Sequence, residues 1–264
     1  MIEFADARVF HEAFWSARDA PDWNVGGDRL WFGPERDWFW AGTGGLDDHQ
    51  VPAEIDPGNW KALSDSEWRL EARLRNRTTG DLTEIDVTRR VIIVEQSPNR
   101  IEYRTTNTLR VLSGQAVSAW NVLQVPLGGQ LTIGLAAELS YRDYLDPVDP
   151  SRFTVRGGQA VLQSTGEHMF KIGLPARVFG GWLFYARGDI VIERTVPVHQ
   201  NRHYCDGPRD ADPAAPGDVL QIFEDDGHYG GYTEIEHHSP AARAGESVVD
   251  DYRTVLRKVE DQPE

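Results

Sequence analysis

Apolar and polar residues alternate along much of the chain, and helical periodicity is almost absent. In one clear case, Trp68, Leu70, Ala72 and Leu74 alternate with charged residues. Because successive side chains of a β-strand point to opposite faces, this pattern predicts a strand with one buried face. Further strands are predicted at short spacing over 85–94, 101–105, 119–125, 130–136, 159–163, 169–174, 182–186, 189–196, 219–224, 232–237 and 248–256.

The number and spacing of these strands predict an all-β protein. About a dozen short strands joined by turns favour two antiparallel sheets packed face to face. Helix is predicted only around 57–63. The Pro- and Asp-rich segment 206–218 is interpreted as a surface loop, because strands continue beyond it. No change in composition marks a domain boundary, so we expect a single domain over residues 1–264.

The chain is acidic, which narrows its partners. Its formal net charge of −15 over 264 residues argues against nucleic acid and anionic membrane. The single cysteine, Cys205, excludes an intrachain disulfide and a cysteine-rich zinc site. Adjacent His237 and His238 would point apart on a strand, so no metal site is predicted, and no cofactor is expected. The N-terminus lacks a secretory signal pattern and no run approaches the ~20 apolar residues of a membrane span, so we expect a cytoplasmic protein of undetermined oligomeric state.

The most informative segment covers residues 232–240. As a strand, it places Tyr232, Glu234, Glu236 and His238 on one face. A phenol, two carboxylates and an imidazole side by side can bind a polyhydroxylated ligand or transfer protons. The alternative interpretation is a solvated sheet face, because the chain contains 42 Asp plus Glu against 27 Lys plus Arg.

Several short motifs resemble those of a known superfamily and follow the same order. The first is Gly-Gly-Asp-Arg-Leu-Trp-Phe-Gly-Pro-Glu at 26–35. The others lie at 170–173, 181–186, 203–207, 233–236, 239–240 and 245–247. The ordered set resembles the galactose-mutarotase-like (aldose 1-epimerase) proteins. It is most similar to a bacterial branch with a Gly-Gly-x-Arg-Leu-Trp motif near the start and a Glu-x-Glu strand near the end. The resemblance covers most of the chain and is more specific for the fold than for an activity.

The resemblance implies an antiparallel β-supersandwich whose concave sheet face holds a sugar. In working mutarotases, a Glu on a late strand takes the proton of the anomeric hydroxyl while a His protonates the ring oxygen. This Glu carries over best onto Glu236, with Glu234 as the alternative. An early Arg that contacts sugar hydroxyls corresponds to Arg29.

One departure from the family pattern concerns the acid. The mutarotases carry two His in the middle of the chain, whereas this chain has none between His49 and His168. His203 is the first candidate to replace them, because it borders a loop that is expected beside the cleft. His168 is expected on the opposite strand face from Lys171, in a structural role. General acid catalysis is typically worth ~10²–10⁴-fold, so we expect weak or absent mutarotase activity on common free aldoses.

Other candidate ligand-binding residues also have a structural interpretation. Trp31 and Trp40 are suited to stack on a sugar ring, but aromatic residues more often belong to a core. Lys171 lies between two apolar residues and is expected either to extend past them to solvent or to bind a ligand. Tyr204 and Asp206 lie where a strand passes into a loop, a common place for ligand contacts.

These observations predict a protein that binds a sugar or sugar-like ligand and acts as an aldose-epimerase-like isomerase, with Glu236 or Glu234 as the base. The alternative is a non-catalytic carbohydrate-binding protein that kept the cleft and lost the acid. A hydrolase or lyase ranks third: the Cα atoms of the two Glu would be ~6.6 Å apart on one strand, and neighbours on one strand do not flank a bond from opposite sides. We expect the side chains of both Glu to face an open cleft. We also expect Arg29 or Lys171 to contact this carboxylate pair, either directly or through one water molecule.

Overall fold

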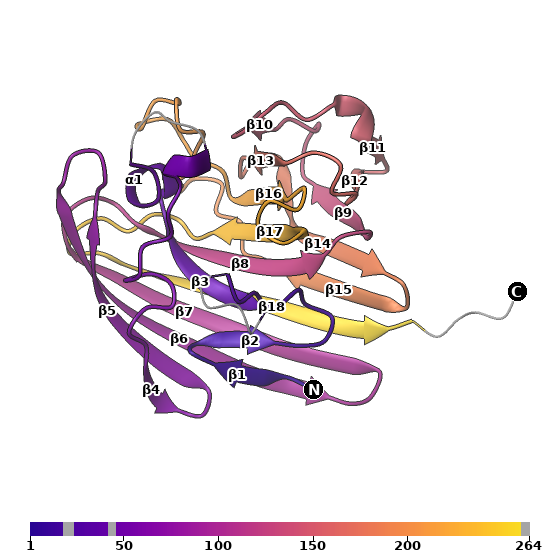
Figure 1. Ribbon diagram of the computed structural model, residues 1–264, viewed down its shortest axis with the longest axis horizontal. Helices are drawn as coiled ribbons and strands as arrows, with labels where there is room; N and C mark the ends of the chain where they lie inside the picture. Colours follow the sequence, from indigo (N-terminus) through magenta and orange to yellow (C-terminus); the bar gives the residue numbers. More distant parts are fainter. Residues whose placement is uncertain (18–23, 42–45, 260–264) are drawn as a thin grey trace, which may run out of the picture.

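Two antiparallel β-sheets packed face to face make up the structure (Figure 1). It is a computed structural model that describes residues 1–17, 24–41 and 46–259. The eight-stranded sheet contains, in spatial order, β1 (Glu3–Ala5), β2 (Arg8–Phe10), β3 (Asp28–Gly33), β8 (Ser118–Pro126), β17 (Tyr232–His238), β16 (Leu220–Glu224), β13 (Phe170–Leu174) and β10 (Arg142–Asp143). The ten-stranded sheet contains β11 (Phe153–Arg156), β12 (Gln159–Gln163), β9 (Gln130–Leu135), β14 (Phe179–Arg187), β15 (Ile190–Thr195), β18 (Ser247–Lys258), β7 (Arg100–Ser113), β6 (Leu82–Gln96), β5 (Glu67–Arg75) and β4 (Lys61–Ser64).

The predicted all-β sandwich and its main strands are confirmed. In β5, Trp68, Leu70 and Leu74 are buried while the charged residues between them face outward. The strand predicted from residue 232 is β17, which pairs with β16 on one side and β8 on the other. Both of its edges are therefore hydrogen-bonded, and its side chains are held in a fixed register.

The helix predicted around 57–63 is wrong. This region forms a turn and then β4, which pairs with β5 at the edge of the ten-stranded sheet. The helical segments of the described residues are short: α1 (Glu35–Trp38), η1 (Leu46–Asp48) and η2 (Pro150–Arg152). None of them is long and apolar enough to cross a membrane. The sequence patterns also missed β3, because all six of its residues are buried and no alternation marks it.

A buried ionic cluster joins the two sheets through Asp28 of β3. Its Oδ2 accepts hydrogen bonds from Arg194 Nη2 (2.5 Å) and Tyr103 Oη (2.8 Å). Its Oδ1 accepts from Tyr252 Oη (3.2 Å) and Arg89 Nη2 (3.4 Å). These four partners belong to four strands of the opposite sheet, β15, β7, β18 and β6. One fully buried carboxylate therefore fixes the position of β3 relative to the ten-stranded sheet.

We expect Asp28→Asn to destabilise the fold strongly, because it leaves Arg89 and Arg194 buried without their carboxylate. Removing one member of a buried ion pair typically costs ~3–5 kcal/mol. Urea unfolding measures the loss. Asp251→Asn is the matched control, since Asp251 pairs with Arg104 at the surface and such pairs contribute ~0–1 kcal/mol. Equal losses in the two variants would contradict the role given to Asp28.

Candidate functional site

A cleft of about 980 Å³ lies on the face of the eight-stranded sheet that points away from the other sheet. This volume is in the range of sites for small molecules. Charged side chains from the sheet and from surrounding loops line it together with aromatic rings. The aromatic lining includes Trp31, Trp40, Trp120, Phe223, Tyr229 and Tyr232.

The alternation of β17 places Glu234 and Glu236 on the cleft side of the sheet, as predicted, while Ile235 belongs to the core between the sheets. Glu234 lines the cleft and is 6% exposed, whereas Glu236 is fully buried beneath it. Glu234 Oε1 accepts hydrogen bonds from Gln124 Nε2 (2.7 Å) and Arg29 Nη2 (3.2 Å). The prediction of an open cleft therefore holds directly for Glu234 and not for Glu236.

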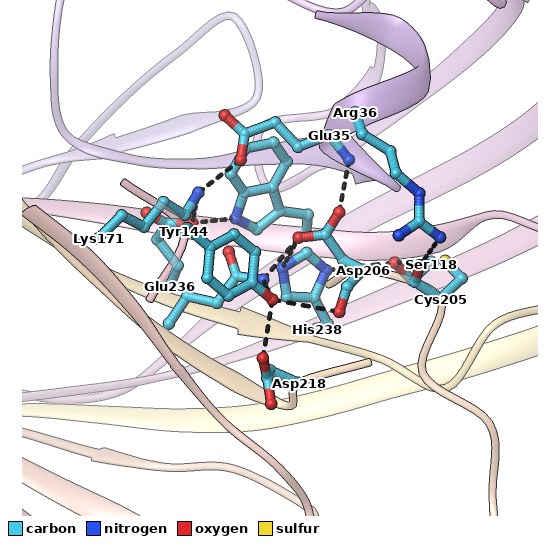
Figure 2. A network of polar contacts seen from close by, with 12 residues as sticks. Glu35, Arg36, Ser118, Tyr144, Lys171, Cys205, Asp206, Asp218, Glu236 and His238 are labelled. Atoms are coloured by element: carbon cyan, nitrogen blue, oxygen red, sulfur yellow. Dashed lines mark hydrogen bonds and ion pairs between the residues drawn. The ribbon is translucent and has the colours of Figure 1, made fainter. Parts of the chain in front are cut away.

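Lys171 of β13 lies between two carboxylates (Figure 2). Its Nζ is 2.8 Å from Glu35 Oε2 and 3.0 Å from Glu236 Oε2, and it stands over the ring of Trp120. Burial alone would lower the pKa of Lys171, but the two carboxylates raise it above its ordinary value. Lys171 is therefore held as a cation in the floor of the cleft.

The carboxyl group of Glu236 has a raised pKa. Its Oε2 accepts a hydrogen bond from Trp120 Nε1 (2.7 Å) in addition to the ion pair with Lys171. Burial raises the pKa of Glu236 to about 8, against the opposing effect of Lys171, and the nearby charges of Glu234 and Glu35 add to the rise.

Glu35 reaches the site because β3 ends in a tight approach to its neighbours. A Cβ on Gly33 would lie 2.7 Å from Ser118 Oγ, so a larger residue would force the side chain of Ser118 to shift. Pro34 follows, and Glu35 begins α1 at the edge of the cleft. Burial alone would raise the pKa of Glu35, but Lys171 and His49 lower it to about 2.

His49 enters the cleft from the segment after η1. Its Nε2 is 3.3 Å from Glu35 Oε1, and its ring stacks on Phe39 and contacts Trp40 edge-on. A carboxylate partner of this kind selects which imidazole nitrogen carries the proton. His49, Glu35, Lys171 and Glu236 therefore form one chain of contacts from the wall of the cleft to its floor.

Asp206 holds the backbone of Glu35, one member of this series of contacts. It is fully buried, and its Oδ1 accepts the backbone N–H of Glu35 at 2.5 Å. Burial and the charge of Glu35 raise the pKa of Asp206 to about 6. His238 lies beside it, stacked on Trp120, and burial lowers the pKa of His238 well below its ordinary value.

Arg29 also lies beneath the cleft, with 1% exposure. It contacts Glu234 and, through Nη1 at 3.7 Å, Asp56. Asp56 also accepts hydrogen bonds from Trp31 Nε1 (2.7 Å) and from Arg8. The predicted cation beside the carboxylate pair is thus present twice, Arg29 at Glu234 and Lys171 at Glu236.

The structure brings most of the predicted site residues together, but not all of them. Trp31, Trp40, Lys171, Tyr232 and Glu234 line the cleft. Arg29, Asp206 and Glu236 lie directly below, within contact of lining residues.

Two predicted residues lie elsewhere, and one expected to be structural borders the cleft. Tyr204 is buried in the core, where its hydroxyl accepts the backbone N–H of His199. His203 is absent from the cleft lining among the described residues, and burial together with Arg243 and Arg36 lowers its pKa. His168 lies in a bend before β13, so the alternation of strand side chains does not set its direction. It lines the cleft, contrary to the structural role expected from the sequence.

Sequence reasoning missed Glu35 and His49. Glu35 is the last residue of the segment 26–35, and its place in that segment was the available signal. His49 carried no signal, because no periodic sequence pattern connects it with its partner Glu35. Among the described residues, no group of three or more His, Cys, Asp or Glu is arranged to hold a metal ion.

The fold is similar to that of solved aldose 1-epimerase-like proteins. A proposed aldose 1-epimerase from Escherichia coli K12 superposes with a TM-score of 0.55 at 12% identity, over 98% of this chain and 96% of that one. A galactose mutarotase-like protein from Lactobacillus casei gives a TM-score of 0.47 at 10% identity, over 88% and 85% of the two chains. No family model and no curated protein sequence matches the chain. The first likeness confirms the predicted supersandwich fold.

The raised pKa of Glu236 predicts how the stability of the fold depends on pH. The folded protein binds this proton more tightly than the unfolded chain, so the free energy of unfolding falls as the pH rises from about 4.5 to about 8. Glu236→Gln removes the titrating group but keeps an acceptor for Trp120. We expect the variant to lose part of this decline, measured by urea unfolding across that pH range. Glu138→Gln, at an exposed position, is the control and keeps the decline; an unchanged slope in Glu236→Gln would contradict the assignment.

Proposed function

We propose that the cleft binds a sugar and interconverts its anomers by acid–base chemistry. The observation that carries the proposal is that a carboxylate, Glu234, and a histidine, His49, line the same cleft. Ring opening of a cyclic sugar needs a base at the anomeric hydroxyl and an acid at the ring oxygen. The similarity of fold to aldose 1-epimerase-like proteins agrees with this chemistry, although function resides in the site.

Glu234 is the better candidate for the base. Sequence reasoning preferred Glu236, but Glu236 is fully buried, while Glu234 borders the cleft. Burial raises the pKa of Glu234 above its ordinary value, against the effect of Arg29. A carboxylate with a raised pKa accepts a proton more readily near neutral pH. Arg29 and Gln124 hold the carboxylate in place from below.

His49 is the candidate acid. Glu35 Oε1 lies 3.3 Å from its Nε2 and orients the ring toward the proposed transfer. In the proposed step, Glu234 takes the proton from the anomeric oxygen, His49 gives a proton to the ring oxygen, and the bond between C1 and the ring oxygen breaks. Rotation about C1–C2 and ring closure on the other face of the aldehyde return both protons and give the other anomer.

A non-catalytic carbohydrate-binding role is the second candidate. It is favoured by the ion pairs of Glu234 with Arg29 and of Glu35 with Lys171, which fit structural carboxylates equally well. Such a protein would bind sugars in the cleft without accelerating their exchange.

We expect Glu234→Gln to reduce anomer exchange by ~10²–10⁴-fold, because it removes the proton acceptor while keeping the shape of the side chain. Polarimetry on glucose and galactose anomers measures the rate, and ligand-observed NMR measures binding. His49→Gln is expected to have a loss of similar size, while Glu138→Gln keeps the parent rate.

The same measurements separate the alternatives. Binding without exchange above the buffer rate would assign the non-catalytic role, and it would agree with the weak activity expected from the missing mid-chain histidines. Full activity in His49→Gln with loss in His168→Gln would make His168 the acid. If no sugar binds at all, the proposed function is wrong.

A further inference from the structure

The charges around the cleft are strongly unequal. Seven carboxylates and four Lys or Arg side chains line it. Two of the carboxylates, Glu35 and Glu234, form the ion pairs described above. The other five are Asp143, Asp146, Asp149, Asp210 and Asp226, on the loops and the edge strand around the opening.

The lining cations are already engaged with the protein. Lys171 lies between two carboxylates, and Arg152 donates to the buried carboxylate of Glu224 at 2.9 Å. Arg36 donates to the carbonyl of Cys205, and the guanidinium of Arg209 stands over the ring of Trp40 at 4.6 Å. A phosphate group binds through bidentate or multiple donors from Arg and Lys. Here, Lys171 and Arg152 would have to leave their carboxylates to bind such a group.

The five aspartates around the opening form the rim of the cleft, and three of them have no ion-pair partner among the described residues. Asp146, Asp210 and Asp226 are exposed, and no Lys, Arg or His of the described residues lies within ion-pair distance of them. A cleft lined by one sign of charge concentrates the field and raises the local concentration of ligands of the opposite sign. The net charge of −15 on the whole chain acts in the same direction.

We infer that the cleft selects its ligand by charge: it takes sugars without a phosphate or carboxylate group, and among these it favours amino sugars that carry an ammonium group. This inference rests on the proposed function, because it concerns the ligand of the same cleft. The buried floor, where Lys171 and Arg29 are neutralised by carboxylates, recognises hydroxyl groups. The rim supplies the attraction for a cation and the repulsion of an anion.

The test uses matched ligands that share one sugar ring. Binding of glucose, glucosamine and glucose 6-phosphate is measured by ligand-observed NMR at low salt and at a pH where the amine is protonated, and the galactose series is measured in the same way. We expect the phosphate ester to bind at least ~10-fold more weakly than the parent sugar and the amino sugar to bind more tightly. Both differences should shrink in ~0.5 M salt, because exposed charges are screened.

A rim variant connects the effect to particular residues. The double variant Asp146→Asn, Asp226→Asn should reduce the preference for the amino sugar and leave the affinity for the neutral sugar within about twofold. Asp65→Asn, on an exposed turn between β4 and β5, is the matched control and should change neither. A phosphate ester that binds as tightly as its parent sugar, or an unchanged amino-sugar preference in the double variant, would overturn the inference while leaving the proposed function intact. Failure of every sugar to bind would reject the proposed function itself.

Discussion

The structure depends on one buried carboxylate. Asp28 contacts four strands of the opposite sheet, including two arginines that would otherwise be buried cations. Its neighbour Arg29 points to the other face of β3 and holds Glu234. Because adjacent residues of a strand face opposite ways, two consecutive charges serve two layers. The anion connects the sheets, and the cation positions a side chain of the cleft.

The floor of the cleft follows the same logic of compensated charge. Isolated buried charges are costly, so each one here lies next to an opposite charge or several hydrogen-bond donors. Lys171 contacts both Glu35 and Glu236, and the backbone N–H of Glu35 donates a hydrogen bond to Asp206. Removing any one member leaves an uncompensated neighbour. The network is thus held in one arrangement before any ligand arrives, which is what electrostatic catalysis and selective binding both require.

The sequence was sufficient for what depends on strand periodicity. The common face of Tyr232, Glu234 and Glu236 follows from alternation alone, and the nearby cations follow from the repulsion between two carboxylates. Depth within the face could not be predicted, because whether Glu236 or Glu234 meets the cleft depends on Trp120 and Lys171 from other strands.

Residues outside strands escaped prediction for a different reason. His49 follows η1 and joins the site through a contact with Glu35 that no local sequence pattern encodes. Tyr204 lies next to a loop, as expected, but its largely apolar ring packs into the core instead of facing the cleft. Loop position alone therefore does not distinguish a ligand contact from a core residue.

The central position of β17 divides the site into two parts that can vary separately. Its backbone is hydrogen-bonded along both edges, so Glu234 and Glu236 belong to a rigid base that tolerates little change. The side chains at the opening, such as Asp146, Arg209 and Asp226, lie on loops, where substitutions disturb the sheet less than substitutions within a strand. The loops at the opening can therefore be changed with little effect on the floor. For protein engineering, the opening is the natural place to randomise and the floor is the part to keep.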